Sequence, residues 1–78
     1  MMIKVNLPKS GMGIDEGTVH RWLKRVGDNV TRGEVLVEVE TAKALTEVQA
    51  PASGVLAQIL VPEGTAAPVN SALALIEG

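Results

Sequence analysis

The sequence predicts an all-β domain built from two similar halves. Three observations support this prediction: short stretches in which apolar and polar residues alternate, turn-forming residues between those stretches, and an internal repeat. A helix is difficult to place. The best candidate, residues 20–26, is bracketed by two glycines, and its counterpart in the repeat contains Pro62. With 78 residues and no cysteine, we expect residues 1–78 to form one small domain without disulfides.

Eight segments have the pattern of strands, and each is bounded by residues that favour turns. The predicted strands cover residues 3–6, 17–24, 29–31, 35–41, 44–49, 54–61, 66–68 and 72–77. Two of the turns contain Gly33 and Asn70, which occupy equivalent positions in the repeat. Both residue types tolerate left-handed backbone, so we predict that these two turns have the same conformation.

The internal repeat becomes visible when the chain is shifted by 37 residues. The identical pairs are Gly17 and Gly54, Leu23 and Leu60, Gly27 and Gly64, Leu36 and Leu73, and Glu40 and Glu77. The apolar pattern repeats as well, and the single aromatic residue, Trp22, falls opposite Ile59, which favours a packing role for it. Two halves that cannot each bury an apolar face alone are expected to pack together.

Composition excludes several classes of function. The net charge of −2 argues against nucleic acid as a partner, and no apolar stretch is long enough to span a membrane. One histidine is too few for an ordinary histidine-based metal site, and no nucleophile–base pair suggests an independent enzyme. We expect a soluble intracellular domain, although an excised piece of a larger protein has the same composition.

Lys43 lies at the tip of a predicted hairpin. Residues 35–40 and 45–50 have strand patterning, and Thr41-Ala42-Lys43-Ala44 joins them. Tight hairpin turns favour Asn, Asp or Gly, so these residues indicate a purpose other than turn formation. An ordinary lysine is protonated at neutral pH and is a poor nucleophile, which argues against covalent catalysis. From the hairpin alone a merely solvated lysine is the default interpretation, and it is the rest of the chain that favours a lysine carrying a prosthetic group.

An ordered series of short motifs resembles the lipoyl domains of 2-oxo acid dehydrogenase complexes, which belong with biotin-carrier domains to one superfamily. The series covers essentially the whole chain. Its members are Leu7-Pro8-Lys9-Ser10-Gly11-Met12, Asp15-Glu16-Gly17-Thr18-Val19, Trp22, Gly27-Asp28-Asn29-Val30, Gly33-Glu34-Val35-Leu36, Glu38-Val39-Glu40-Thr41-Ala42-Lys43-Ala44, Pro51-Ala52-Ser53-Gly54 and Pro62-Glu63-Gly64.

The resemblance implies a flattened β-barrel, or barrel-sandwich hybrid, of two four-stranded antiparallel sheets related by a pseudo-twofold axis. It places Lys43 on the hairpin between the fourth and fifth strands, at one end of the molecule. The chain termini are then expected near the other end, and the loop over residues 8–16 beside the hairpin.

The resemblance also implies a function. A lipoate ligase or lipoyl transferase attaches lipoate covalently to Lys43, and the resulting arm carries acyl groups and electrons between active sites. The implied partners are a thiamine-diphosphate-dependent 2-oxo acid dehydrogenase, an acyltransferase core and dihydrolipoamide dehydrogenase. The chain is then a non-catalytic carrier domain of a pyruvate- or acetoin-type complex, in the cytoplasm of a bacterium or in the mitochondrial matrix of a eukaryote.

The hairpin departs from the family pattern at one position. Ala42 stands where lipoyl domains usually have Asp, whereas Glu40 keeps the acidic residue three positions before the lysine. Biotin domains typically have methionine on both sides of the lysine, and here both neighbours are alanine. The residues expected to be recognised by partners are Asp15, Glu16, Glu40, Thr41, Ala42 and Ala44. A biotin carrier of a carboxylase and an unmodified adaptor of the same fold remain as alternatives.

Overall fold

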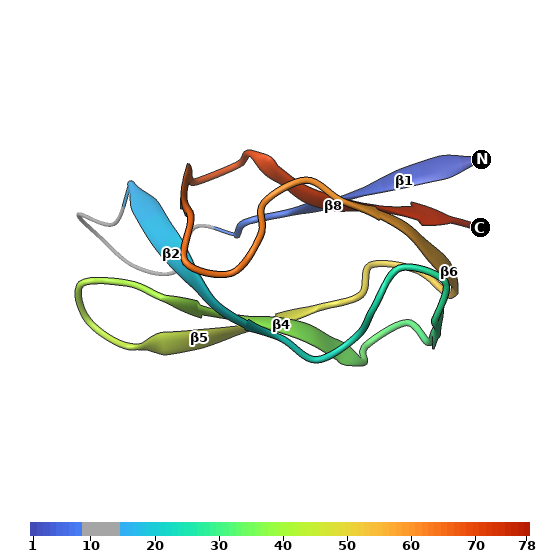
Figure 1. The fold of residues 1–78 in the computed structure, drawn as a ribbon, viewed down its shortest axis with the longest axis horizontal. Helices are drawn as coiled ribbons and strands as arrows, with labels where there is room; N and C mark the ends of the chain where they lie inside the picture. Colours follow the sequence, from blue (N-terminus) through green and yellow to red (C-terminus); the bar gives the residue numbers. More distant parts are fainter. Residues whose placement is uncertain (9–14) are drawn as a thin grey trace.

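Figure 1 shows the arrangement of strands in a computed structural model, which describes residues 1–8 and 15–78. The eight strands are β1 (Met2–Asn6), β2 (Glu16–Trp22), β3 (Asn29–Val30), β4 (Val35–Glu40), β5 (Leu45–Gln49), β6 (Gly54–Ile59), β7 (Ala66–Pro68) and β8 (Ala72–Glu77). They form two four-stranded antiparallel sheets with the orders β1-β8-β6-β3 and β5-β4-β2-β7. The predicted all-β fold is confirmed, and every predicted strand is present within two residues of its expected ends.

The largest deviations from the predicted boundaries occur at the ends of β2 and β6. Each strand stops two residues early, at Trp22 and at Ile59, because the chain bends at the leucine that follows. The two leucines still donate their amide hydrogens to neighbouring strands, Leu23 to the carbonyl of Leu36 and Leu60 to that of Leu73, both at 2.8 Å. The departure is therefore the same in the two halves.

The register of the sheets reproduces the repeat residue by residue. In one half Thr18 pairs with Glu40 and Val19 with Val39. In the other half, the residues 37 positions later, Val55 and Leu56, pair with Glu77 and Ile76. Both ladders are interrupted at the next position, where β2 and β6 each have one extra residue. The residue pairs of the β1–β8 ladder likewise correspond to those of the β5–β4 ladder. The two halves are thus related by a pseudo-twofold axis.

Apolar residues from both sheets form a single core between them. Its most buried members are aliphatic, with exposed fractions of 0–4%. They are Val5, Leu7, Val19, Val30, Leu36, Val37, Val39, Val48, Ala50, Leu56, Ala67, Leu73, Ala74 and Ile76. Trp22 is half-buried against this core, and its indole Nε1–H donates to the carbonyl oxygen of Val61 at 2.9 Å, so its packing role is confirmed.

Two equivalent glycines allow the strands to approach closely. A Cβ atom at Gly17 would lie 2.4 Å from Cγ1 of Val39, and one at Gly54 would lie 2.3 Å from the carbonyl oxygen of Glu77. Neither distance is compatible with a side chain at an unshifted backbone. The glycines that mark the start of each repeat are therefore required by packing rather than by an unusual φ angle.

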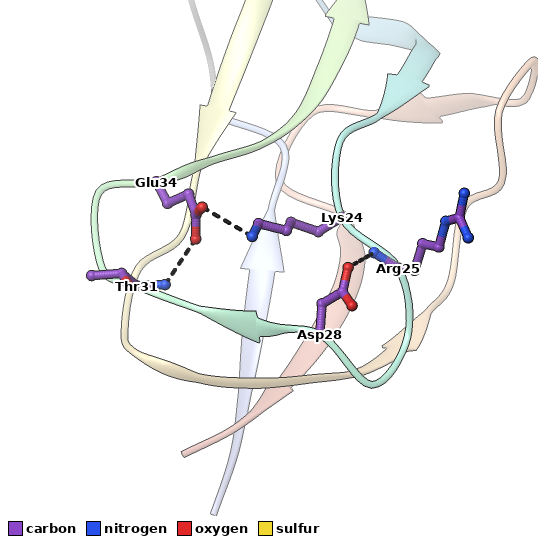
Figure 2. A network of polar contacts seen from close by, with 5 residues as sticks. All are labelled: Lys24, Arg25, Asp28, Thr31 and Glu34. Atoms are coloured by element: carbon purple, nitrogen blue, oxygen red, sulfur yellow. Dashed lines mark hydrogen bonds and ion pairs between the residues drawn. The ribbon is translucent and has the colours of Figure 1, made fainter.

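The two turns predicted to match do have the same backbone conformation. The φ angle is 88° at Gly33 and 71° at Asn70, both in the left-handed region. The turn before Gly33 is further tied by a polar network (Figure 2), in which the Glu34 carboxylate accepts from the Thr31 amide at 3.0 Å and pairs with the Lys24 ammonium at 3.1 Å. This network lies at the start of β4, and the Thr41–Ala44 hairpin follows the opposite end of that strand.

Candidate functional site

The hairpin between β4 and β5 carries Lys43 at one end of the molecule. In Figure 1 this hairpin projects at the end opposite the N and C termini, as the resemblance implied. The molecule is about 33 Å long, so the hairpin and the termini are well separated. The side chains of Ala42, Lys43 and Ala44 are all exposed, and all but one of the valines of the two strands behind them are buried. The lysine is therefore presented to solvent on a firmly packed base.

Thr41 organises the tip. Its amide donates to the carbonyl oxygen of Ala44 at 2.9 Å, which closes the last rung of the ladder. Its hydroxyl donates to the same carbonyl at 2.9 Å and accepts from the amides of Ala44 at 3.2 Å and Lys43 at 3.4 Å. The turn therefore does not need Asn or Gly. Among non-glycine residues of the described ranges, only Asn70 has a positive φ angle.

The turn preferences of the two central residues do not predict this role of Thr41. Ala42 and Lys43 offer no turn chemistry, but the residue before them does. Threonine hydroxyls can accept hydrogen bonds from amides two or three residues further on. A threonine directly before a two-residue tip therefore indicates a turn held by its hydroxyl.

A shallow acidic groove runs beside the tip. It encloses about 370 Å³ and lies between the start of β2 and the end of β4. Its lining consists of Asp15, Glu16, Gly17, Thr18, Glu40, Thr41 and Ala42. Among the described residues that line it there are three carboxylates and no cations, so this part of the groove favours cationic groups of a partner over anionic ones.

The structure brings together five of the predicted recognition residues. Asp15, Glu16, Glu40, Thr41 and Ala42 share the groove, and Ala44 lies across the turn from them. The predicted loop over residues 8–16 lies largely outside the described residues, as does the Gly11–Gly13 segment. The last two residues of the loop, Asp15 and Glu16, are described and lie beside the hairpin, as expected.

The opposite end of the molecule shows what the site shares with the rest of the fold. By the pseudo-twofold relation, Gly78 corresponds to Thr41 and Met1 to Ala44. The Gly78 amide donates to the Met1 carbonyl at 3.0 Å, which reproduces the closing bond of the hairpin. A groove also lies at this end, but Glu77 is the one carboxylate among its described lining residues. The features particular to the hairpin are therefore the two tip residues, the threonine hydroxyl and the acidic lining of its groove.

The described residues contain neither a cluster of side chains suited to a metal ion nor a helix suited to a membrane. Within residues 1–8 and 15–78 no cluster of three His, Asp or Glu side chains has an arrangement suited to a metal ion. The same residues contain no helix long and apolar enough to cross a bilayer.

A sandwich of two related four-stranded sheets with a lysine exposed at a hairpin tip defines the class of biotin- and lipoyl-attachment domains. The sequence comparison agrees with this class. The biotin/lipoyl family, whose model is described as "Biotin-requiring enzyme", matches residues 3–76.

Individual relatives narrow the assignment. The chain is 44% identical over 77 residues to the dihydrolipoyllysine-residue acetyltransferase component of the pyruvate dehydrogenase complex of Rickettsia bellii, covering 97% of this chain and 18% of that protein. It is 39% identical to the lipoyl domain of the 2-oxoglutarate dehydrogenase complex from Azotobacter vinelandii, with a TM-score of 0.76 and coverage of 97% of this chain and 98% of that one. The chain belongs to the biotin/lipoyl family, and within it to the lipoyl domains of 2-oxo acid dehydrogenase complexes.

One further structure is similar in fold alone. The urea carboxylase of Kluyveromyces lactis contains a region with a TM-score of 0.84 to this chain, at 22% sequence identity, which covers 99% of this chain and 6% of the enzyme. The chain therefore shares its fold with both structures, whereas the higher sequence identity lies with the lipoyl domain.

Proposed function

We propose that Lys43 is the attachment point of a lipoyl group and that the chain is a swinging-arm carrier of a 2-oxo acid dehydrogenase complex of the pyruvate or acetoin type. The observation that carries this proposal is the position of the lysine, at the exposed tip of a stiff hairpin in a lipoyl-domain fold. The proposal extends to lipoate as cofactor and to the complex as the setting in which the domain works.

The residues around Lys43 fit a covalently attached arm. Its neighbours Ala42 and Ala44 are small and exposed, so they leave the approach to the amine open to an attaching enzyme. Attachment forms an amide between Nζ and the carboxyl carbon of lipoate, which removes the positive charge of the lysine. When bound, the dithiolane ring supplies acyl-accepting and two-electron redox chemistry that a cysteine-free chain lacks.

The chain itself contributes a rigid mount and a surface for recognition. The buried valines of β4 and β5 fix the direction in which the tip projects, and the threonine network fixes the tip. We assign the acidic groove of Asp15, Glu16 and Glu40 to recognition by the partner enzymes. Those partners are a lipoate ligase or lipoyl transferase, the thiamine-diphosphate-dependent dehydrogenase, the acyltransferase core and dihydrolipoamide dehydrogenase.

A biotin carrier is the second candidate, and the observation in its favour is the match of residues 3–76 to the family described as "Biotin-requiring enzyme". Identity and the alanines on both sides of Lys43 favour lipoate. The choice is decided by offering the chain both cofactors. Purified chain is incubated with ATP and either lipoate and a lipoate ligase or biotin and a biotin ligase, and the intact mass is then measured.

We expect one lipoyl increment per chain and no biotin increment. Lys43→Arg should remain unmodified, because arginine keeps the charge but cannot form the amide under these conditions. The matched control is Lys4→Arg on β1, an edge strand of the other sheet, which should be modified as the wild type is. A biotin mass increment would show a biotin carrier in place of a lipoyl carrier, and an unmodified chain would favour the adaptor function.

A further inference from the structure

We propose that Thr41 is a positioning residue for the modification of Lys43: its hydroxyl holds the tip in the conformer that the attaching enzyme selects. This inference rests on the proposed function, because it concerns how that site is prepared for its enzyme. Thr41 acts through the backbone of the tip and does not touch the reacting atoms.

The hydroxyl of Thr41 is fully used at the tip. A hydroxyl offers one donor and two acceptor positions. Here the donor goes to the carbonyl oxygen of Ala44 at 2.9 Å, and the two acceptor positions receive the amides of Ala44 and Lys43 at 3.2 and 3.4 Å. One side chain therefore ties the backbone of the lysine, at the centre of the turn, and that of Ala44, which follows it.

The opposite end of the molecule separates this role from folding. Gly78, the counterpart of Thr41, has no side chain, yet its amide still makes the closing hydrogen bond to the carbonyl of Met1 at 3.0 Å. The ladder therefore closes in the same way with and without a threonine. What the threonine adds is confined to the tip, where it orders residues on which the core does not depend.

An ordered tip matters because the modifying enzyme binds a short exposed segment. If the competent conformer is only partly populated, the apparent affinity falls by the populated fraction, whereas the bound complex reacts at its usual rate. Removal of the hydroxyl should therefore raise KM more than it lowers kcat. The expected loss of kcat/KM is about three- to tenfold, the range spanned by typical net hydrogen-bond contributions.

The reaction to be followed is amide formation from lipoyl adenylate, which the ligase makes from ATP and lipoate. The bond that forms joins Nζ of Lys43 to the acyl carbon, the bond that breaks is that carbon to the phosphate oxygen, and AMP leaves. The lysine ammonium releases two protons in the overall step. No electron transfer is involved.

The experiment compares Thr41→Val with Thr41→Ser by steady-state lipoylation at varied concentrations of the chain. Valine has the shape of threonine without the hydroxyl, and serine keeps the hydroxyl. We expect Thr41→Val to show the increase in KM and Thr41→Ser to remain within about twofold of the wild type. Thr46→Val is the matched control, because Thr46 is half-buried on β5 of the same hairpin, outside this network.

A second measurement does not depend on modification. Amide hydrogen exchange of the unmodified chain should be faster at Lys43 and Ala44 in Thr41→Val and unchanged at Val39, since the ladder stays closed. The inference would be overturned, and the proposed function left intact, if Thr41→Val and the wild type had equal exchange rates at Lys43 and Ala44. Equal KM values for lipoylation of these two proteins would have the same consequence. Failure of the wild type to accept lipoate would instead overturn the proposed function, and the inference with it.

Discussion

The two ends of this molecule are built on the same frame, but only one of them has the features of a carrier site. Glu40 and Glu77 end equivalent strands, and the same backbone hydrogen bond follows each of them. At one end the chain continues through Ala42 and Lys43, and at the other end the two termini meet. The frame is therefore a property of the fold, and the chemistry belongs to a few residues added to it.

The largest expected effect concerns the glycines on which that frame depends. Gly54→Ala should lower the free energy of unfolding by about 2–4 kcal/mol, because the new methyl group meets the backbone carbonyl of Glu77, which cannot move aside. Gly17→Ala should cost less, about 1–3 kcal/mol, because the nearest atom is a methyl group of Val39. Urea unfolding followed by circular dichroism measures both. A larger loss of stability for Gly17→Ala than for Gly54→Ala would contradict this ranking of the two contacts.

The next prediction compares equivalent glutamates at the two ends. If the acidic groove is recognised, Glu40→Gln should reduce the rate of lipoylation about three- to tenfold, since it removes one of the three carboxylates that line the groove. Glu77→Gln changes the same charge at the other end and should leave the rate unchanged. Initial rates with a purified ligase measure both. Equal rates for the two variants would exclude Glu40 from recognition.

A smaller effect is expected at the network of Figure 2, which has no ionic counterpart in the other half. The amide of Thr31, followed by the ammonium of Lys24, lowers the pKa of Glu34 below the ordinary value of 4.5. A lowered carboxyl pKa stabilises the fold above that ordinary value, and this contribution is lost as the pH falls through the folded-state pKa. At the equivalent position Ser71 uses an uncharged hydroxyl, which donates to Pro68 at 2.6 Å.

Glu34→Gln should therefore flatten the acid side of the stability profile. The amide oxygen of glutamine can still accept from Thr31, so the turn is retained while the titration is removed. The measurement is the urea midpoint between about pH 3 and pH 6, the range around an ordinary glutamate. Identical pH profiles for the variant and the wild type would assign the acid sensitivity to other carboxylates.

The smallest effect is expected at the turn where the two halves have different residues with the same backbone conformation, Gly33 and Asn70. Gly33→Asn places in one half the residue found at the equivalent turn of the other, where Asn70 has a φ angle of 71°. The free energy of unfolding should change by less than about 0.5 kcal/mol. Gly33→Ala is the control and should cost about 1 kcal/mol, because alanine lacks the local hydrogen bonding that helps asparagine adopt positive φ. A large loss with asparagine would show that the two turns are not interchangeable.

These contrasts also indicate which parts of the structure were readable from the sequence. The eight strands, the repeat and the matching turns at Gly33 and Asn70 follow from alternation and from residue types with strong backbone preferences. The position of Lys43 at a hairpin tip follows from the same patterns. Such features depend on short stretches of chain and need no knowledge of which side chains meet.

The remaining features depend on contacts between side chains and backbone that only the folded chain defines. The three hydrogen bonds of the Thr41 hydroxyl and the bond from the Trp22 indole to Val61 are examples. The groove is another, because it brings Asp15 and Glu16 beside Glu40 across two paired strands. Alternation places these residues on strands but does not specify their distances.

The most direct test of the central claim is to map the modification on the chain isolated from the cells that make it. No lysine or arginine follows Lys43 up to residue 78, so trypsin separates residues 33–43 from residues 44–78 in an unmodified chain. Amide formation at Lys43 blocks that cleavage, and a single uncut peptide that includes residues 33–78 and carries one lipoyl group is the predicted result. Complete cleavage after Lys43, or a biotin increment in its place, would contradict the assignment of this hairpin as a lipoyl carrier.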